Sequence, residues 1–122
     1  MSEKFKPQIK APIGFYRLRK NDPEKFAALV GGCGPGKWGD YFVPDTIWGL
    51  SITLACQIHD YMYWVGGTAE DKFRADTIFL QNMIALIWNG SNSLTFPLRV
   101  LRAAKYYIAV ARHGDNAFSS KP

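Results

Sequence analysis

The chain has 122 residues, which suits a single domain with a buried core, and its 48% hydrophobic content excludes a disordered protein. With 15 Lys and Arg against 10 Asp and Glu, its formal net charge of +5 favours anionic partners such as an acidic membrane surface or nucleic acid. The apolar runs are interrupted by acidic residues and a histidine, so none of them predicts a membrane-spanning helix.

The N-terminal third predicts a basic arm, a short helix and a loop. Residues 1–20 are rich in Lys and Arg and contain two prolines, which indicates an extended basic arm that packs through its apolar residues. These are Phe5, Ile9, Ile13, Phe15 and Tyr16. Asp22 suits the N-cap of a short helix, Pro23 suits its first position, and Gly31 suits its end. The sequence GGCGPGKWGD at residues 31–40 then predicts a glycine-rich loop.

Three longer helices are expected in the remaining sequence. The first extends from beyond Pro44 to Val65, where Gly66 and Gly67 end it. Thr68 and Asp71 form a capping-box pattern for the second, at about residues 69–88. The third extends from near Pro97 to His113 and ends at Gly114. Little strand-type alternation is present, so we predict one all-α domain over residues 1–122.

One carboxylate lies within an apolar stripe of the helix at residues 69–88. Phe73, Leu80, Met83 and Ile87 recur at helical spacing, and Asp76 falls on the same stripe. A carboxylate that faces a core is costly unless a partner compensates it. The partner can be a backbone amide, a tyrosine hydroxyl or a histidine; alternatively, Asp76 lies at the edge of the stripe.

His59 has the right position to pair with Asp76. Helices joined by a short turn pack antiparallel, and the two residues lie seven before Gly66 and eight after Thr68. Both are therefore roughly 10–12 Å from the turn, at the same level. A carboxylate that binds one imidazole nitrogen fixes the tautomer and leaves the other nitrogen to accept a proton. The pattern favours His59 as a general base over a purely structural histidine.

Asp60 points about 100° away from His59 around the same helix. It is either a solvated aspartate or a ligand of a metal ion. Ca²⁺ takes six to eight oxygen ligands, so backbone carbonyls would have to supplement one carboxylate. If Cys33 pairs with Cys56, the disulfide brings the carbonyl-rich loop at Gly32, Gly34 and Gly36 toward Asp60. Two buried free thiols are the alternative, favoured in a reducing compartment.

The ordered motifs resemble the phospholipase A2 superfamily. That family combines a Cys-Gly-x-Gly calcium loop, a helix with Cys-x-x-His-Asp-x-x-Tyr, and a later helix with an aspartate. The corresponding sequences are CGPG at 33–36, CQIHDYMY at 56–63 and RADTIF around Asp76. The resemblance covers roughly residues 31–83, and the GPG loop is closest to the viral and prokaryotic branches. It implies a phospholipase A2-like fold in which two long antiparallel helices carry the site beside a calcium loop.

The resemblance also implies a role for each matching residue. His59 would activate a water molecule, Asp76 would orient His59, and Tyr63 would donate a hydrogen bond to Asp76. Asp60 would bind Ca²⁺. The residues that complete the site lie in the loop: carbonyls of Gly32, Gly34 and Gly36 as calcium ligands, the amide of Gly34 at the oxyanion, and a Cys33–Cys56 disulfide.

The sequence departs from the family pattern at four positions. Ala55 precedes Cys56 where the family has a second cysteine, and Met62 replaces another cysteine. Gly32 stands at a position that is often aromatic, and Lys37 replaces a common glycine of the loop. Because the dense disulfide framework of secreted animal members is absent, aromatic side chains must contribute more of the packing.

The resemblance therefore implies Ca²⁺-dependent hydrolysis of the sn-2 acyl ester of glycerophospholipids at a membrane surface. A catalytically weak module of the same fold is the alternative, and a basic nucleic-acid-binding domain is disfavoured because it leaves Asp76 unexplained. Secretion or delivery to a membrane is favoured, although the N-terminus lacks a signal peptide.

The basic residues of the last helix predict a solvated face or a surface that docks on anionic lipid. These are Arg99, Arg102, Lys105 and Arg112. Several aromatic residues predict core packing, an acyl-chain pocket or a membrane interface. These are Trp38, Tyr41, Phe42, Trp48 and Trp64.

Overall fold

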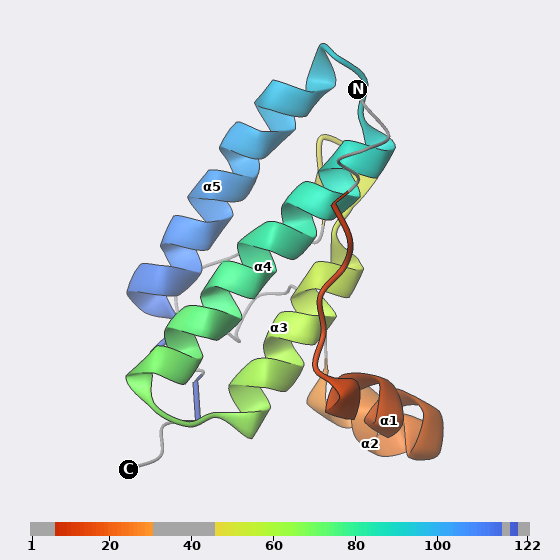
Figure 1. Ribbon diagram of the computed structural model, residues 1–122, viewed down its shortest axis with the longest axis vertical. Coiled ribbons are helices and arrows are strands. Elements are labelled where there is room, and N and C mark those ends of the chain that lie inside the picture. The colour runs from red at the N-terminus through yellow and green to blue at the C-terminus, as the bar shows by residue number, and fades with distance from the viewer. Residues whose placement is uncertain (1–6, 31–45, 116–117, 120–122) are drawn as a thin grey trace.

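The computed structural model describes residues 7–30, 46–115 and 118–119, and it is mostly helical, which confirms the all-α prediction (Figure 1). The helices are α1 (Ile13–Asn21), α2 (Pro23–Leu29), α3 (Thr53–Val65), α4 (Ala69–Gly90) and α5 (Thr95–His113). Two short strands, β1 (Thr46–Ile47) and β2 (Leu50–Ser51), precede α3.

The three long helices lie side by side in the order α3, α4, α5, with α4 between the other two (Figure 1). The main core lies where these helices meet, and it includes Ile52, Phe79, Met83 and Val110. The short helices α1 and α2 pack at one side of α3 around a second cluster formed by Phe15, Phe26, Val30 and Ile58. Within the described ranges, no helix is long and apolar enough to cross a bilayer.

The turn between α3 and α4 has the predicted chemistry. The Asp71 carboxylate accepts a hydrogen bond from the Thr68 amide at 2.9 Å, and the Thr68 hydroxyl accepts one from the Asp71 amide, so the capping box is present. Gly66 ends α3 at φ 71°, and a Cβ there would lie 1.9 Å from the Ser119 carbonyl oxygen. Only glycine fits both this conformation and this close approach.

The prediction of a helix that starts just beyond Pro44 is wrong at its N-terminal end. A β-hairpin occupies residues 46–51, with Thr46 opposite Ser51, and α3 begins at Thr53. Trp48 and Gly49 form the turn at φ 49° and 81°, and two consecutive residues with positive φ cannot belong to a right-handed helix. Ile47 still enters the main core from this hairpin.

The prediction of an extended arm over residues 1–20 also needs correction. Residues 7–12 are not helical, but α1 begins at Ile13, directly after Pro12. Burial of Phe15 among the side chains of the second cluster stabilises this helix. The preceding segment is fixed to α4 because Asn82 accepts from the Lys10 amide at 2.7 Å and donates to the Lys10 carbonyl at 2.8 Å.

The other helices agree closely with the sequence. Asp22 caps α2 by accepting from the Lys25 amide at 3.1 Å, and Pro23 occupies the first position. Helix α5 begins two residues before the expected Pro97 and ends at His113 as predicted. The Asn92 side chain precedes α5 and accepts from the Thr95 amide at 2.9 Å.

Candidate active site

The α3–α4 hairpin brings His59 and Asp76 into direct contact. His59 Nε2 and Asp76 Oδ1 are 2.8 Å apart, and the two residues are only 1% and 2% exposed. This is the level pairing that the distances from the turn predict. A buried carboxylate beside an imidazole orients the ring and selects which nitrogen carries the proton.

Tyr63 binds the same carboxylate oxygen. Its hydroxyl donates to Asp76 Oδ1 at 2.5 Å, and it lies one helical turn after His59 on α3. The ring of Phe79 stacks on the imidazole with a centroid distance of 4.5 Å and an interplanar angle of 26°. The ring of His59 is therefore held by a hydrogen bond at one edge and by aromatic packing on its face.

Lys72 completes the network and was not anticipated from the sequence. Its Nζ donates to the other carboxylate oxygen, Asp76 Oδ2, at 2.9 Å. It also donates to the carbonyls of Val110 and Ala111 near the end of α5, at 3.2 and 3.3 Å. The four-residue spacing of Lys72 and Asp76 is the signal in the sequence that could have revealed this contact.

These contacts set the protonation states of the site. Burial lowers the pKa of His59 below its ordinary value, against the opposing influence of Asp76. Burial alone would raise the pKa of Asp76, but hydrogen bonds from His59, Tyr63 and Lys72 outweigh it and hold that pKa below its ordinary value. Burial and the Asp76 carboxylate raise the pKa of Tyr63 well above its usual range. At neutral pH the site therefore contains a neutral imidazole beside an ionised carboxylate.

The C-terminal residues close one side of this network. The Ser119 amide donates to the Tyr63 carbonyl at 3.1 Å, and Phe118 packs edge-on against the Tyr63 ring. A Cβ at Gly114 would lie 2.5 Å from the Tyr63 hydroxyl oxygen, so glycine gives the hydroxyl room to reach Asp76. Residues far apart in the sequence thus contribute to one enclosed polar site.

Asp60 follows His59 on α3 and is 7% exposed, so it is not the solvated aspartate that was one reading of the sequence. The predicted loop ligands Gly32, Gly34 and Gly36 lie outside the described residues, and so does Cys33. Cys56, on α3, is 1% exposed, and its pairing with Cys33 remains a prediction. Among the described residues no group of three His, Cys, Asp or Glu side chains forms a metal site, but the predicted site uses mainly carbonyls.

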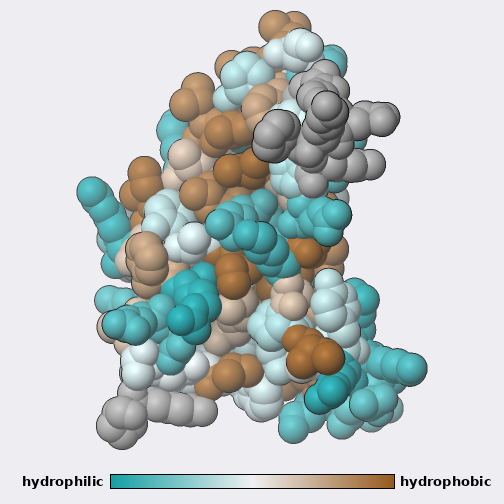
Figure 2. Space-filling view, viewed as in Figure 1, coloured by the Kyte–Doolittle hydropathy of each residue, from teal (hydrophilic) through white to brown (hydrophobic). Residues whose placement is uncertain are grey.

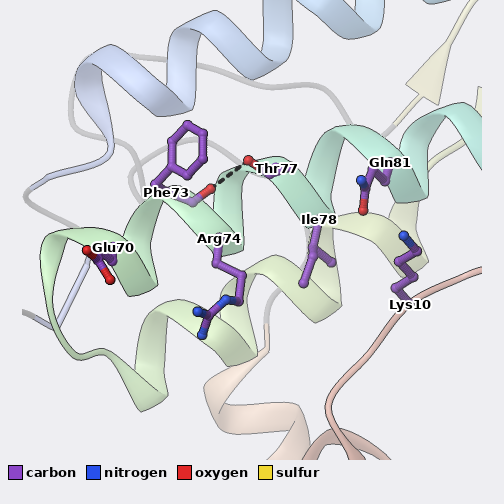
Figure 3. A pocket seen from close by; sticks show the side chains of 7 residues that line it. All are labelled: Lys10, Glu70, Phe73, Arg74, Thr77, Ile78 and Gln81. Carbon is purple, nitrogen blue, oxygen red and sulfur yellow. Dashed lines mark hydrogen bonds between the residues drawn. The ribbon is translucent and has the colours of Figure 1, made fainter.

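The prediction for the stripe on α4 was wrong at Phe73, which is 66% exposed. Asp76, Met83 and Ile87 are buried, but Phe73 lies about 60° around the helix from Asp76, at the edge of the buried face. It lines a shallow groove of about 480 Å³ together with Lys10, Arg74 and Ile78 (Figure 3). This groove lies on a different face of α4 from the carboxylate network.

The structure also describes the basic residues predicted on the last helix and some of the aromatic residues predicted near the site. Arg99 is not part of a solvated face, because its guanidinium donates to the carbonyls of Gly90 and Trp48, each at 2.9 Å. Trp48 and Trp64 are 56% and 42% exposed, so neither is a core residue. The other three aromatic residues of that group, Trp38, Tyr41 and Phe42, lie outside the described residues.

No family model, curated protein or solved structure matches this chain.

Proposed function

We propose that this chain is a phospholipase A2-like, Ca²⁺-dependent hydrolase of the sn-2 ester of glycerophospholipids. The observation that carries the proposal is the shared carboxylate of Asp76, which contacts His59 Nε2 and the Tyr63 hydroxyl through one oxygen and Lys72 through the other. Such an arrangement fixes a neutral imidazole in one orientation, as a general base requires. The His-Asp-x-x-Tyr motif and the later aspartate supply the resemblance on which the substrate class depends.

The chemistry of His59 follows from its hydrogen bond. Since Nε2 faces Asp76, Nδ1 on the other side of the ring would accept a proton from a water molecule that attacks the ester carbonyl carbon. Collapse of the tetrahedral intermediate breaks the bond between the acyl carbon and the glycerol oxygen. The imidazolium then returns its proton to that oxygen, and the products are a fatty acid and a lysophospholipid. Asp76 stabilises the transient imidazolium.

The chain contains the types of oxygen ligand that a calcium site requires. Asp60 is a buried carboxylate adjacent in sequence to the base, and Ca²⁺ prefers carboxylate and carbonyl oxygens. Asp60 would hold the ion with carbonyls of Gly32, Gly34 and Gly36, and the Gly34 amide would donate to the oxyanion. When bound, Ca²⁺ supplies positive charge that stabilises the oxyanion of the intermediate.

A second function is favoured by a different observation. The side chain of His59 is 0% exposed, and its Nδ1 is also shielded from solvent within the described structure. A chain in which water does not reach this nitrogen would retain the fold and act as a membrane-binding or structural module. The two functions differ in turnover, so an assay of ester hydrolysis separates them.

The test is release of fatty acid from mixed phospholipid vesicles with millimolar Ca²⁺, compared with EGTA. We expect His59→Gln to lower the rate by about 10²–10⁴-fold, the usual contribution of a general base. The chain has two histidines, and His113→Gln at the end of α5 is the matched control, which should retain the wild-type rate. Equal rates for His59→Gln and wild type would contradict the assignment of the base.

Asp60→Asn tests the metal. We expect this variant to fold and to require a much higher Ca²⁺ concentration for half-maximal release. Glu70→Gln, at an exposed carboxylate on α4, should need the same Ca²⁺ concentration as the wild type. If neither variant changes the Ca²⁺ dependence, Asp60 does not bind the ion. If the wild type releases no fatty acid at all, the module without turnover is the correct function.

A further inference from the structure

Helix α5 has apolar side chains on two opposite faces. The inner face buries Ala103 and Val110 in the core shared with α4. On the outer face, Leu98, Leu101 and Ile108 are 39%, 65% and 48% exposed. They recur at helical spacing, so they form one stripe instead of isolated exposed residues. Large apolar side chains gathered on a surface indicate an interaction site.

The β1–β2 hairpin adds a tryptophan to this stripe. Trp48 is 56% exposed and lines a shallow depression of about 420 Å³ with residues of α5. Arg99 donates to the Trp48 carbonyl at 2.9 Å, and the Tyr106 hydroxyl donates to the Thr46 carbonyl at 3.3 Å. Because both bonds come from α5, the hairpin and the helix present one continuous surface.

The backbone of the turn supports a role for the exposed tryptophan. Trp48 is the only described residue other than glycine with a positive φ, at 49°. Bulky side chains rarely occupy this conformation, which Asn or Asp adopts more readily. An indole at this position brings a large amphipathic ring to the tip of the hairpin, and indoles favour the boundary between water and lipid.

The positive charges on this surface indicate which kind of partner it binds. Arg102 and Lys105 line the same depression as the apolar stripe, and residues 77–114 contain no Asp or Glu. A second copy of this face would bring like charges together with no carboxylate to compensate them. Nucleic acid would neutralise the cations but would leave the exposed leucines against phosphates. An anionic lipid surface accepts both kinds of side chain, since apolar groups enter the acyl boundary and cations bind the headgroups.

We propose that α5 and the hairpin dock this chain on the surface of an anionic phospholipid bilayer. The docking face consists of Trp48, Leu98, Leu101, Arg102, Lys105 and Ile108. The inference rests on the proposed function, for which a phospholipid surface supplies the substrate. The docking face includes neither His59 nor Asp60, so its binding to lipid is measured separately from hydrolysis. Figure 2 shows hydrophobic surface toward the end of the molecule where α5 begins, whereas hydrophilic residues dominate near α1 and α2.

Sedimentation with vesicles of phosphatidylcholine and phosphatidylserine, in EGTA, tests the docking face. The double variant Arg102→Gln/Lys105→Gln should bind about 30-fold more weakly, since each cation near an anionic surface contributes a factor of about five. Leu101→Gln should weaken binding about tenfold. The matched controls are Arg17→Gln/Lys20→Gln on α1 and Phe73→Gln on α4, which remove exposed residues of the same types and should bind as wild type does.

Trp48 provides a direct readout of contact with lipid. Its fluorescence should shift to shorter wavelength on vesicles, and Trp48→Phe should remove most of the shift that the four tryptophans give together. The proposal is overturned if the docking-face variants and the controls bind equally. It is also overturned if binding is the same on phosphatidylcholine alone, or if the face is covered in a dimer that Leu101→Gln dissociates.

Failure of this inference differs from failure of the proposed function. If docking fails, the variants of the docking face hydrolyse vesicles as fast as the wild type does. If the proposed function fails, vesicle binding persists and depends on Arg102 and Lys105, but no fatty acid is released with Ca²⁺.

Discussion

The buried face shared by α3 and α4 differs from the outer face of α5 in how polar and apolar groups are distributed. Between α3 and α4, four polar side chains converge where a core would ordinarily be apolar: His59, Tyr63, Lys72 and Asp76. On α5, Leu101 and Ile108 face solvent where polar residues would ordinarily lie. Both regions depart from the usual sorting of residues, and such departures are expected at functional sites.

The difference between the regions lies in what each departure costs the fold. Buried polar groups are costly when unpaired, so each member of the site depends on the others. Exposed leucines cost the folded chain little, because they are also exposed in the unfolded chain. Variants at the site should therefore change both stability and activity, while variants on the docking face should weaken vesicle binding, and with it the hydrolysis of vesicles, without changing stability.

The largest effect is expected from Asp76→Asn. This change removes the buried carboxylate 2.9 Å from the ammonium group of Lys72, which then keeps, among the described residues, only the exposed Asp115 carboxylate at 3.6 Å, and it weakens the hold on His59. Loss of one member of a buried ion pair lowers the free energy of unfolding by about 3–5 kcal/mol. Urea denaturation measures the loss, and Glu70→Gln, six residues earlier on α4 but exposed, should stay within about 0.5 kcal/mol of the wild type. A loss below 1 kcal/mol for Asp76→Asn would contradict the interdependence of the site.

Lys72→Met should have the next largest effect on stability. The thioether can replace the alkyl stem, but the charge-assisted hydrogen bond to Asp76 and those to the α5 carbonyls are lost. Hydrogen bonds to charged groups contribute about 1.5–3 kcal/mol, and we expect a loss of that size in urea denaturation. Arg74→Met is the matched control, because the ion pair of Arg74 with Asp71 is exposed and should contribute less than about 1 kcal/mol. If the two variants lose equal free energy of unfolding, the buried contacts of Lys72 contribute no more than an exposed ion pair.

The pH dependence of stability provides a smaller effect. The pKa of His59 lies below its ordinary value of 6.5 in the folded chain and returns toward that value on unfolding. Between these two values the unfolded chain binds more protons, so stability rises with pH. Below about pH 6.5 the free energy of unfolding should fall, by at most about 1.4 kcal/mol per pH unit for this one group.

His59→Gln identifies the source of this slope. Urea denaturation in EGTA at several pH values should give a flatter profile for the variant between the two pKa values of His59. At lower pH both proteins also lose stability as Asp76, whose pKa is lowered in the folded chain, becomes protonated. A slope unchanged by the substitution would show that His59 is not the buried neutral imidazole.

The smallest change in stability is expected from Leu101→Gln. The side chain is 65% exposed, so the free energy of unfolding should change by no more than about 0.5 kcal/mol. Circular dichroism during urea denaturation checks this, and vesicle sedimentation of the same sample should show the loss of binding. A strongly destabilised variant would mean that Leu101 stabilises the fold, and it would contradict the expected difference between the site and the docking face.

Local patterns in the sequence were sufficient to predict much of the hairpin that carries the site. The capping box at Thr68 and Asp71 marks where α4 begins, and glycines mark where α3 ends. Once both ends are known, the rise per residue determines that His59 and Asp76 are level, and the structure places them 2.8 Å apart.

Features that depend on distant contacts were not predicted. Lys72 contacts carbonyls 38 and 39 residues away, and Asn82 contacts Lys10 across 72 residues, so neither partner is visible in the sequence around it. The β1–β2 hairpin was missed because a turn at Trp48-Gly49 lacks the usual Asn or Asp at its first position. Helix α1 was missed because its stability comes from Phe15 in the second cluster, whereas its charges resemble those of a solvated arm.

The central claim is tested most directly with a phospholipid that carries distinguishable labels on its sn-1 and sn-2 acyl chains. The chain is incubated with mixed vesicles of this lipid in millimolar Ca²⁺, and the released fatty acid is identified. We predict release of the sn-2 label alone, its loss in EGTA, and its loss in His59→Gln while that variant still binds the vesicles. Release of both labels, release that persists in EGTA, or an active His59→Gln variant would contradict the account.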